Sequence, residues 1–176
     1  MHPDAWQGMR ERNAVGPTDD GLREMEKGPR YSTSPMTNTC EQNSEFVRRH
    51  YEKLRSGDWK AAAEDYAEDA ANFGRPVGRA GYLRVFEDIY TTFPDWDMEI
   101  EDMAAEGDNV IVRCRVSGTH LGVGHLPVNG GRLVGVDPTG KRFEVQHIHW
   151  HTLRDGRFAD HYAVRDDLGM MSQLGF

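Results

Sequence analysis

Three histidines alternate with apolar residues in one short segment. His147, His149 and His151 are separated by Ile148 and Trp150. If the segment is a strand, the three imidazoles share one face, because side chains alternate between the two faces of a strand. Their Cα atoms are then about 6.6 Å apart, which allows two rings to touch one ligand. Imidazole titrates near neutral pH and can both give and take a proton, so such a face can perform acid–base chemistry.

A fourth histidine, His161, follows the Asp155-Gly156 pair, which predicts a tight hairpin. A two-residue turn there pairs His149 with Tyr162 and His161 with Trp150, which places the two histidines on opposite faces. A three-residue turn with a bulge shifts the register by one residue and brings them to the same face. The residues therefore permit a His149–His161 pair without requiring it.

Other interpretations of these histidines stay open. A histidine on a strand also serves as a structural donor to a carbonyl, or lies on the surface. A metal site is a third interpretation, in which His147, His149 and His161 surround zinc or iron with Asp166 as an oxygen ligand. The sequence has no HExxH or CxxC motif to support it, and we predict no metal ligand. GxSxG, GxGxxG and GxxxxGK[ST] are absent as well, which argues against nucleophile-elbow, dinucleotide and P-loop sites.

The elements that position these residues follow from the hydrophobic period. We expect helices from Ser44, as a cap, to about Arg55, then at 59–66 and about 79–92, with Pro94 ending the third. After Pro94 the period changes to two, beginning at Trp96, which is typical of a half-buried strand. Further strands are expected at 110–119, 133–136, 142–154 and 157–165, followed by a short tail. Helices followed by an antiparallel meander predict an α+β domain with the helices on one face of the sheet.

Composition bounds the possible partners. The 176 residues suit one domain, and the formal charge of −8 argues against a nucleic-acid partner, which needs clustered Lys and Arg. No stretch approaches the ~20 apolar residues that span a bilayer, so no membrane partner is expected. The N-terminus lacks the apolar core of a signal peptide, which predicts a cytoplasmic location. Cys40 and Cys114 stand in different settings, so neither a disulfide nor a zinc site is expected.

The first part of the chain differs from the rest. Residues 1–40 contain Pro3, Pro17, Pro29 and Pro35 and few aliphatic residues. We interpret them as a polar arm, either flexible or packed on a neighbouring subunit. Residues 41–176 are then the folded domain.

The C-terminal segments resemble a known family. The run His149-x5-Asp155-Gly156-x4-His161-x4-Asp166-x2-Gly169-x3-Gln173-Leu174-Gly175 is similar to the end of SnoaL-like polyketide cyclases and related ester cyclase proteins. Ser56-Gly57-Asp58-Trp59, Phe93-Pro94-Asp95 and Gly118-Thr119-His120-x-Gly122 fit it too, so the resemblance covers residues 43–175. It implies the nuclear-transport-factor-2-like fold, a cone of three helices on a curved antiparallel sheet around a pocket. It also implies aldol ring closure without a metal or organic cofactor, and a homodimer or homotetramer formed through the outer sheet face.

The resemblance carries over to particular residues. Asn72, His120, His149 and His161 match polar positions in or near the pocket of such cyclases. It favours the bulged register that turns His149 and His161 inward. In the cyclases an aspartate two residues after the His161 position exchanges the proton, and here that position is Ala163, which cannot do so.

We therefore predict a small cofactor-free enzyme that transfers protons next to a carbonyl, as a cyclase, isomerase or hydratase, on a small apolar metabolite. His149 is the expected base, with His161 and Asn72 as orienting groups or oxyanion donors. The residues expected to contact substrate are His120, His147, Tyr51, Phe86, Trp96, Ala163 and Asp166. The alternative is a non-catalytic protein that binds a small molecule in the same pocket, which Ala163 favours.

Overall fold

The structure is a computed structural model that describes residues 39–176, except for the side chains of residues 129 and 130. The expected arm at 1–40 therefore lies almost wholly outside the described residues. At the boundary, Thr39 and Cys40 already belong to the folded domain. No helix among residues 39–176 is long and apolar enough to cross a membrane. The cytoplasmic location stays a prediction.

Three helices come first, as predicted, with shifted ends. Helix α2 spans Cys40–Arg55 and begins earlier than expected, because Thr39 rather than Ser44 caps it through a reciprocal pair of bonds with Gln42. Helix α3, Trp59–Ala63, is capped by Asp58 and ends before the predicted Tyr66. Helix α4, Gly78–Thr92, matches its prediction closely.

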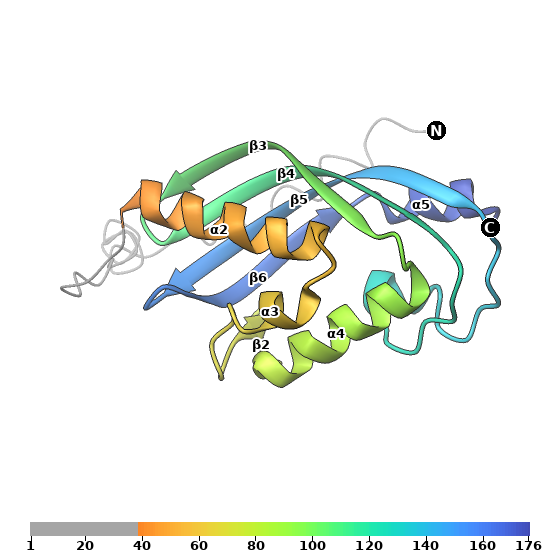
Figure 1. The fold of residues 1–176 in the computed structure, drawn as a ribbon, viewed down its shortest axis with the longest axis horizontal. Coiled ribbons are helices and arrows are strands. Elements are labelled where there is room, and N and C mark those ends of the chain that lie inside the picture. Colours follow the sequence, from red (N-terminus) through yellow and green to blue (C-terminus); the bar gives the residue numbers. More distant parts are fainter. Residues whose placement is uncertain (1–38) are drawn as a thin grey trace, which may run out of the picture. The chain divides into compact units, whose positions relative to one another are not determined.

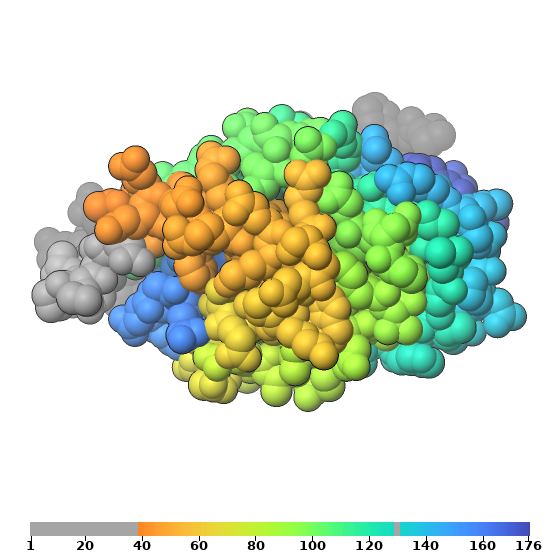
Figure 2. Space-filling view, viewed as in Figure 1, coloured from red at the N-terminus to blue at the C-terminus, as the bar shows by residue number. Residues whose placement is uncertain are grey.

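A four-stranded antiparallel sheet follows, in the order β3-β4-β5-β6. Its strands are β3 Asp97–Glu106, β4 Asn109–Thr119, β5 Arg142–Arg154 and β6 Arg157–Arg165. The sheet is open rather than closed into a barrel. In Figure 1 the helices α2, α3 and α4 lie on one side of this curved sheet, and Figure 2 shows them covering that side. The expected α+β arrangement is confirmed.

Smaller elements complete the domain. A short hairpin, β1 Ala71–Asn72 and β2 Arg75–Pro76, connects α3 to α4. The 3-10 helix η2 spans Val128–Gly131, and α5 spans Asp167–Leu174. The predicted strand at 133–136 was wrong: that segment forms turns, with only an isolated bridge from Val134 to Gly124. The tail, for which no helix was predicted, forms α5 because Asp166 caps it.

The β5–β6 register decides which histidines meet. The turn is the two-residue type, with Asp155 and Gly156 both at positive φ, and it pairs Arg154 with Arg157. A bulge then occurs within β6, between the pairs Leu153–Phe158 and Thr152–Asp160. The register therefore shifts inside the strand rather than in the turn. As a result His151 lies opposite His161, and His149 lies opposite Ala163.

The alternation along β5 shows how the core becomes a polar site. Phe143 and Val145 are buried at one end of the strand, and Leu153 is buried at the other. Between them His147, His149 and His151 occupy the same face, less than a tenth exposed. Imidazoles thus stand in core positions that aliphatic side chains occupy elsewhere on the strand.

Candidate active site

The helices and the buried face of the sheet enclose a cavity of about 120 Å³. Tyr51, Phe86 and Trp96 line it, as predicted for its apolar walls. Phe73, which follows β1, also lines it and is 46% exposed, more than any other lining residue that the structure describes. We therefore place the mouth of the cavity beside Phe73.

Three predicted catalytic residues form one hydrogen-bonded chain. Asn72 Oδ1 accepts a bond from His161 Nδ1 at 3.0 Å, which leaves His161 Nε2 as an acceptor. His149 Nδ1 donates to that nitrogen at 2.8 Å. The neutral His149 ring must then carry its lone pair on Nε2, which is buried and has no partner among the described residues. The chain from Asn72 thus fixes the tautomer of His149.

Two more histidines extend this surface. His151 Nε2 lies 3.1 Å from the hydroxyl of Tyr51, and its ring stacks on His149. His147, at the other end, also lines the cavity. We call the set His147, His149, His151 and His161 the sheet wall.

The sheet wall is built to stay uncharged. Burial lowers the pKa of His161 to about 3 and of His147 to about 4, and the nearby Arg165 guanidinium adds to both effects. Burial, together with the neighbouring imidazoles, also holds the pKa of His149 and His151 well below the usual value. No Asp or Glu is present among the described residues that line the cavity. Among the described residues, no carboxylate charge therefore raises the pKa of His149, His151 or His161, whereas Asp166 acts in that direction on His147.

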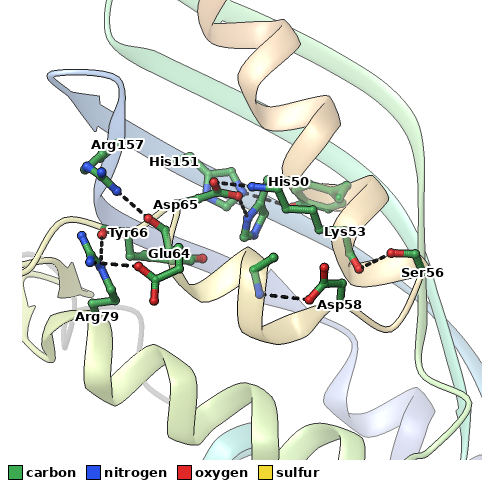
Figure 3. Close-up of polar contacts among 12 residues, drawn as sticks. His50, Lys53, Ser56, Asp58, Glu64, Asp65, Tyr66, Arg79, His151 and Arg157 are labelled. Atoms are coloured by element: carbon green, nitrogen blue, oxygen red, sulfur yellow. Dashed lines mark hydrogen bonds and ion pairs between the residues drawn. The ribbon is translucent and has the colours of Figure 1, made fainter.

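A second polar group, which the sequence did not reveal, lies on the helical side of the cavity. His50 of α2 lines the cavity, and its Nδ1 donates to Asp65 Oδ2 at 2.9 Å. Lys53 Nζ donates to Asp65 Oδ1 at 2.6 Å (Figure 3). We call His50, Asp65 and Lys53 the helix wall. His50 lies among the buried residues of α2, and Asp65 is only 9% exposed.

Three predicted contact residues do not line the cavity. His120 is fully buried against Phe93, and its Nδ1 accepts the backbone N–H of Thr139. Asp166 caps α5, as its side chain accepts from Gly169 N–H. Ala163 lies on the inward face of β6, next to His149 across the strand pair, without reaching the cavity. Of the four polar positions that the resemblance carried over, Asn72, His149 and His161 line the cavity and His120 does not.

The set of residues weighed above for the alternative of a metal site also changes. Among residues 39–176, the group that can offer ligand atoms is His149, His151 and His161, one nitrogen each, and these nitrogens all lie within 4.8 Å of one another. His151 replaces His147 in that alternative because its ring faces His161 across the β5–β6 pair. Asp166 is engaged as a helix cap. The same nitrogens bond to each other and to Tyr51, which is the arrangement of a proton relay as well.

Comparison with known proteins identifies the family. The model of the SnoaL-like polyketide cyclase family matches residues 45–174. This chain belongs to the SnoaL-like polyketide cyclase family. A structural neighbour of this SnoaL-like protein is IdmH, a candidate polyketide cyclase from Streptomyces antibioticus. The two share 31% identity over 77% of this chain and 99% of IdmH, with a TM-score of 0.61.

Two ester cyclases and a further solved structure are also similar to this SnoaL-like protein. The aklanonic acid methyl ester cyclase DauD of Streptomyces sp. strain C5 is 32% identical over 45% of this chain and 45% of its own length. The nogalonic acid methyl ester cyclase of Streptomyces nogalater is 42% identical over 26% of this chain and 34% of its own length. The chain thus spans less than half the length of either. AclR, a candidate hydroxylase from Streptomyces galilaeus, shares the fold, with a TM-score of 0.65 at 22% identity over 78% of this chain and 98% of AclR.

Proposed function

We propose that this SnoaL-like protein is a cofactor-free enzyme that transfers protons next to a carbonyl group of a small, largely apolar metabolite, as a cyclase, isomerase or hydratase does. The observation that carries the proposal is that His149 Nε2 accepts no hydrogen bond from the described residues. It is a buried lone pair without a partner among the described residues, in a ring whose tautomer is fixed by His161 and Asn72. Leaving a buried acceptor unsatisfied costs about 1–3 kcal/mol, so a bound group that donates to it is favoured.

The geometry supports a simple division of roles. His149 Nε2 accepts a proton from the carbon next to the carbonyl. His161 and Asn72 keep that nitrogen deprotonated and hold the ring in place, because their bonds occupy the opposite edge. General base catalysis of this type contributes about 10²–10⁴-fold to a rate.

The size and lining of the cavity define the reacting end of the substrate. A volume of about 120 Å³ is well below the ~300–1,000 Å³ of sites that enclose a drug-sized ligand. We infer that one carbonyl-bearing end enters the cavity and the remainder extends past Phe73 at the mouth. The aromatic and aliphatic side chains of the lining suit an apolar body, and Arg165, which also lines the cavity, suits an oxygen substituent.

The test uses the substrates named by the relatives, aklanonic acid methyl ester and nogalonic acid methyl ester, incubated with the protein in D₂O. Deuterium uptake next to the carbonyl, followed by mass spectrometry, reports proton transfer even where no ring closes. We expect His149→Gln to lower the exchange rate by about 10²-fold or more. His120→Gln is the matched control, a buried histidine outside the cavity, and is expected to keep the rate. Equal rates for wild type and His149→Gln would contradict the proposal.

A binding protein is the second candidate, favoured by Ala163, because the family's proton-exchanging carboxylate is missing. Trp96 lines the cavity, so its fluorescence reports occupancy. A binder changes that fluorescence with the same esters and shows no deuterium uptake. His149→Gln then alters affinity alone.

We further propose a homodimer formed through the outer sheet face. Ile148 and Trp150 of β5 lie there beside Val164 and Tyr162 of β6, all 45–73% exposed. Such a contiguous apolar surface is typical of an interaction site. Arg113 and Arg115 of β4 form ion pairs with Glu101 and Glu99 of β3. Light scattering is expected to show a dimer for the wild type and a monomer for Val164→Lys; a wild-type monomer would contradict this proposal.

A further inference from the structure

The helix wall has no role in the proton transfer proposed above, although its histidine, His50, lines the same cavity. His50 is 1% exposed, and the rings of Tyr51, Tyr66, Phe86, His151 and Phe158 surround it. The Asp65 carboxylate can only accept at its bond to Nδ1, so Nδ1 carries a proton and Nε2 is the exchangeable position. Figure 3 shows Asp65 placed between His50 and Lys53.

The two walls differ in the hydrogen-bond partner of each imidazole. On the sheet wall His161 is backed by the neutral amide of Asn72, and His149 is backed by His161. On the helix wall His50 is backed by a carboxylate at 2.9 Å. His50 is therefore the imidazole of the cavity whose protonated form has a direct anionic partner among the described residues. Burial disfavours a cation that lacks such a partner, and the Asp65 carboxylate partly offsets this cost for His50.

We infer that His50 is a second catalytic residue of this cavity, a general acid that protonates the substrate's carbonyl oxygen, and that Asp65 is its positioning residue. The inference rests on the proposed function, since it supplies the acid that complements the base His149. A pair of titratable groups whose surroundings move their pKa values apart is the usual basis of such an assignment.

The step balances without any co-reactant. The C–H bond next to the carbonyl breaks, its proton passes to His149 Nε2, and its electron pair forms the C=C bond of an enol. The carbonyl π electrons move to oxygen, which takes the proton from His50 Nε2. The enol carbon then either attacks a second carbonyl or is reprotonated by His149 Nε2. In the attack, the π electrons of the second carbonyl move to its oxygen, which takes the proton from His149 Nε2. In both cases the enol hydroxyl returns its proton to His50 Nε2 as the first carbonyl re-forms, so the enzyme is back in its starting state.

The charges around His50 predict its pH dependence. Burial lowers the pKa of His50, and the hydrogen bond and charge of Asp65 oppose that decrease, while Lys53 adds to it. Tyr51 and Tyr66 are neutral, since burial raises the pKa of each well above its usual value. The groups that face His50 are Lys53 and Tyr51 on α2, Asp65 and Tyr66 after α3, His151 on β5 and His161 on β6. Asp65→Asn should therefore lower the pKa of His50, and Lys53→Met should raise it.

The first measurement needs no substrate. A pH titration of the ¹⁵N-labelled histidine side chains by NMR assigns a pKa and a tautomer to each ring. We expect His50 to have the highest pKa of the cavity imidazoles and to carry its neutral proton on Nδ1. Asp65→Asn should lower that pKa by about one unit or more, as loss of an adjacent opposite charge does. Asp69→Asn is the matched control, since Asp69 is exposed and pairs with Arg154, and it should leave the pKa unchanged.

The second measurement follows deuterium uptake against pH. The rate should fall as pH rises through the pKa of His50, because the acid form is lost. Asp65→Asn should move this decrease to lower pH and Lys53→Met to higher pH, opposite changes that a purely structural role for Asp65 does not produce. His50→Gln should lower kcat by about 10²-fold. A His50 pKa no higher than that of His161, or a His50→Gln variant with wild-type kcat, would overturn the inference. If His149→Gln alone loses activity, the proposed function stands without it.

Discussion

The sheet wall and the helix wall contain the same side chain in opposite electrostatic settings. The sheet wall consists of four imidazoles that contact each other. Beside them lie the neutral amide of Asn72, the phenol of Tyr51 and the guanidinium of Arg165. The helix wall has one imidazole bonded to a carboxylate that also pairs with a lysine. Burial lowers the pKa of the histidines on both walls, and the partner beside each ring decides whether that decrease is opposed. The two settings therefore suit the base and the acid proposed above, although no carboxylate is present among the described residues of the lining.

The largest expected effect is the loss of stability in acid, and it comes mainly from the sheet wall. The folded protein binds fewer protons than the unfolded chain once pH falls below the ordinary histidine pKa of about 6.5. Stability should thus decrease from about pH 6.5 downward; with a folded-state pKa of about 3, His161 alone contributes a loss of about 2 kcal/mol by pH 5. Urea unfolding at pH 7.5 and 5.0 measures it. His161→Gln should reduce the pH dependence more than His50→Gln; equal effects would contradict the contrast between the walls.

A smaller effect is expected from giving the sheet wall a carboxylate where it now has an amide. Asn72→Asp places an anion 3.0 Å from His161 Nδ1, as Asp65 is placed against His50. The pKa of His161 should rise from about 3 by about 1–3 units. NMR titration checks it, with Asn72→Leu as the control that removes the acceptor without adding charge. An unchanged pKa in Asn72→Asp would show that burial alone controls the sheet wall.

The smallest effect is expected at the position where the family carries its aspartate. Ala163 lies opposite His149 in the β5–β6 pair and is only partly buried. Ala163→Asp should raise the pKa of His149 by about one unit, since an anion nearby favours the protonated ring but water screens it. It should also increase deuterium uptake, because His149 becomes a stronger base. The same titration and exchange assays measure both, and a lower His149 pKa in Ala163→Asp would contradict this expectation.

Much of the sheet wall was predictable because strand alternation is a local property. His147, His149 and His151 share a face wherever they form a strand, and β5 has the bounds that its sequence indicated. The pairing of His151 with His161 depended on a bulge inside β6, and the turn residues Asp155 and Gly156 do not predict where that bulge lies. The helix wall was missed because His50 and Asp65 are fifteen residues apart and belong to different elements. His120 was misplaced because a resemblance fixes a position in the chain rather than the direction of a side chain.

The sequence by itself determined the three helices before the sheet, its four strands, the shared face of the three histidines on β5 and the family. These follow from periodicity, caps and motifs, which involve residues close together in the chain. The tertiary structure decided which imidazole meets a carboxylate and which meets only neutral neighbours. That choice depends on how α2, the segment after α3 and the sheet pack around the cavity. Because a buried ring takes its charge state from the groups a few ångströms away, the chemistry of each histidine was set only when those elements came together.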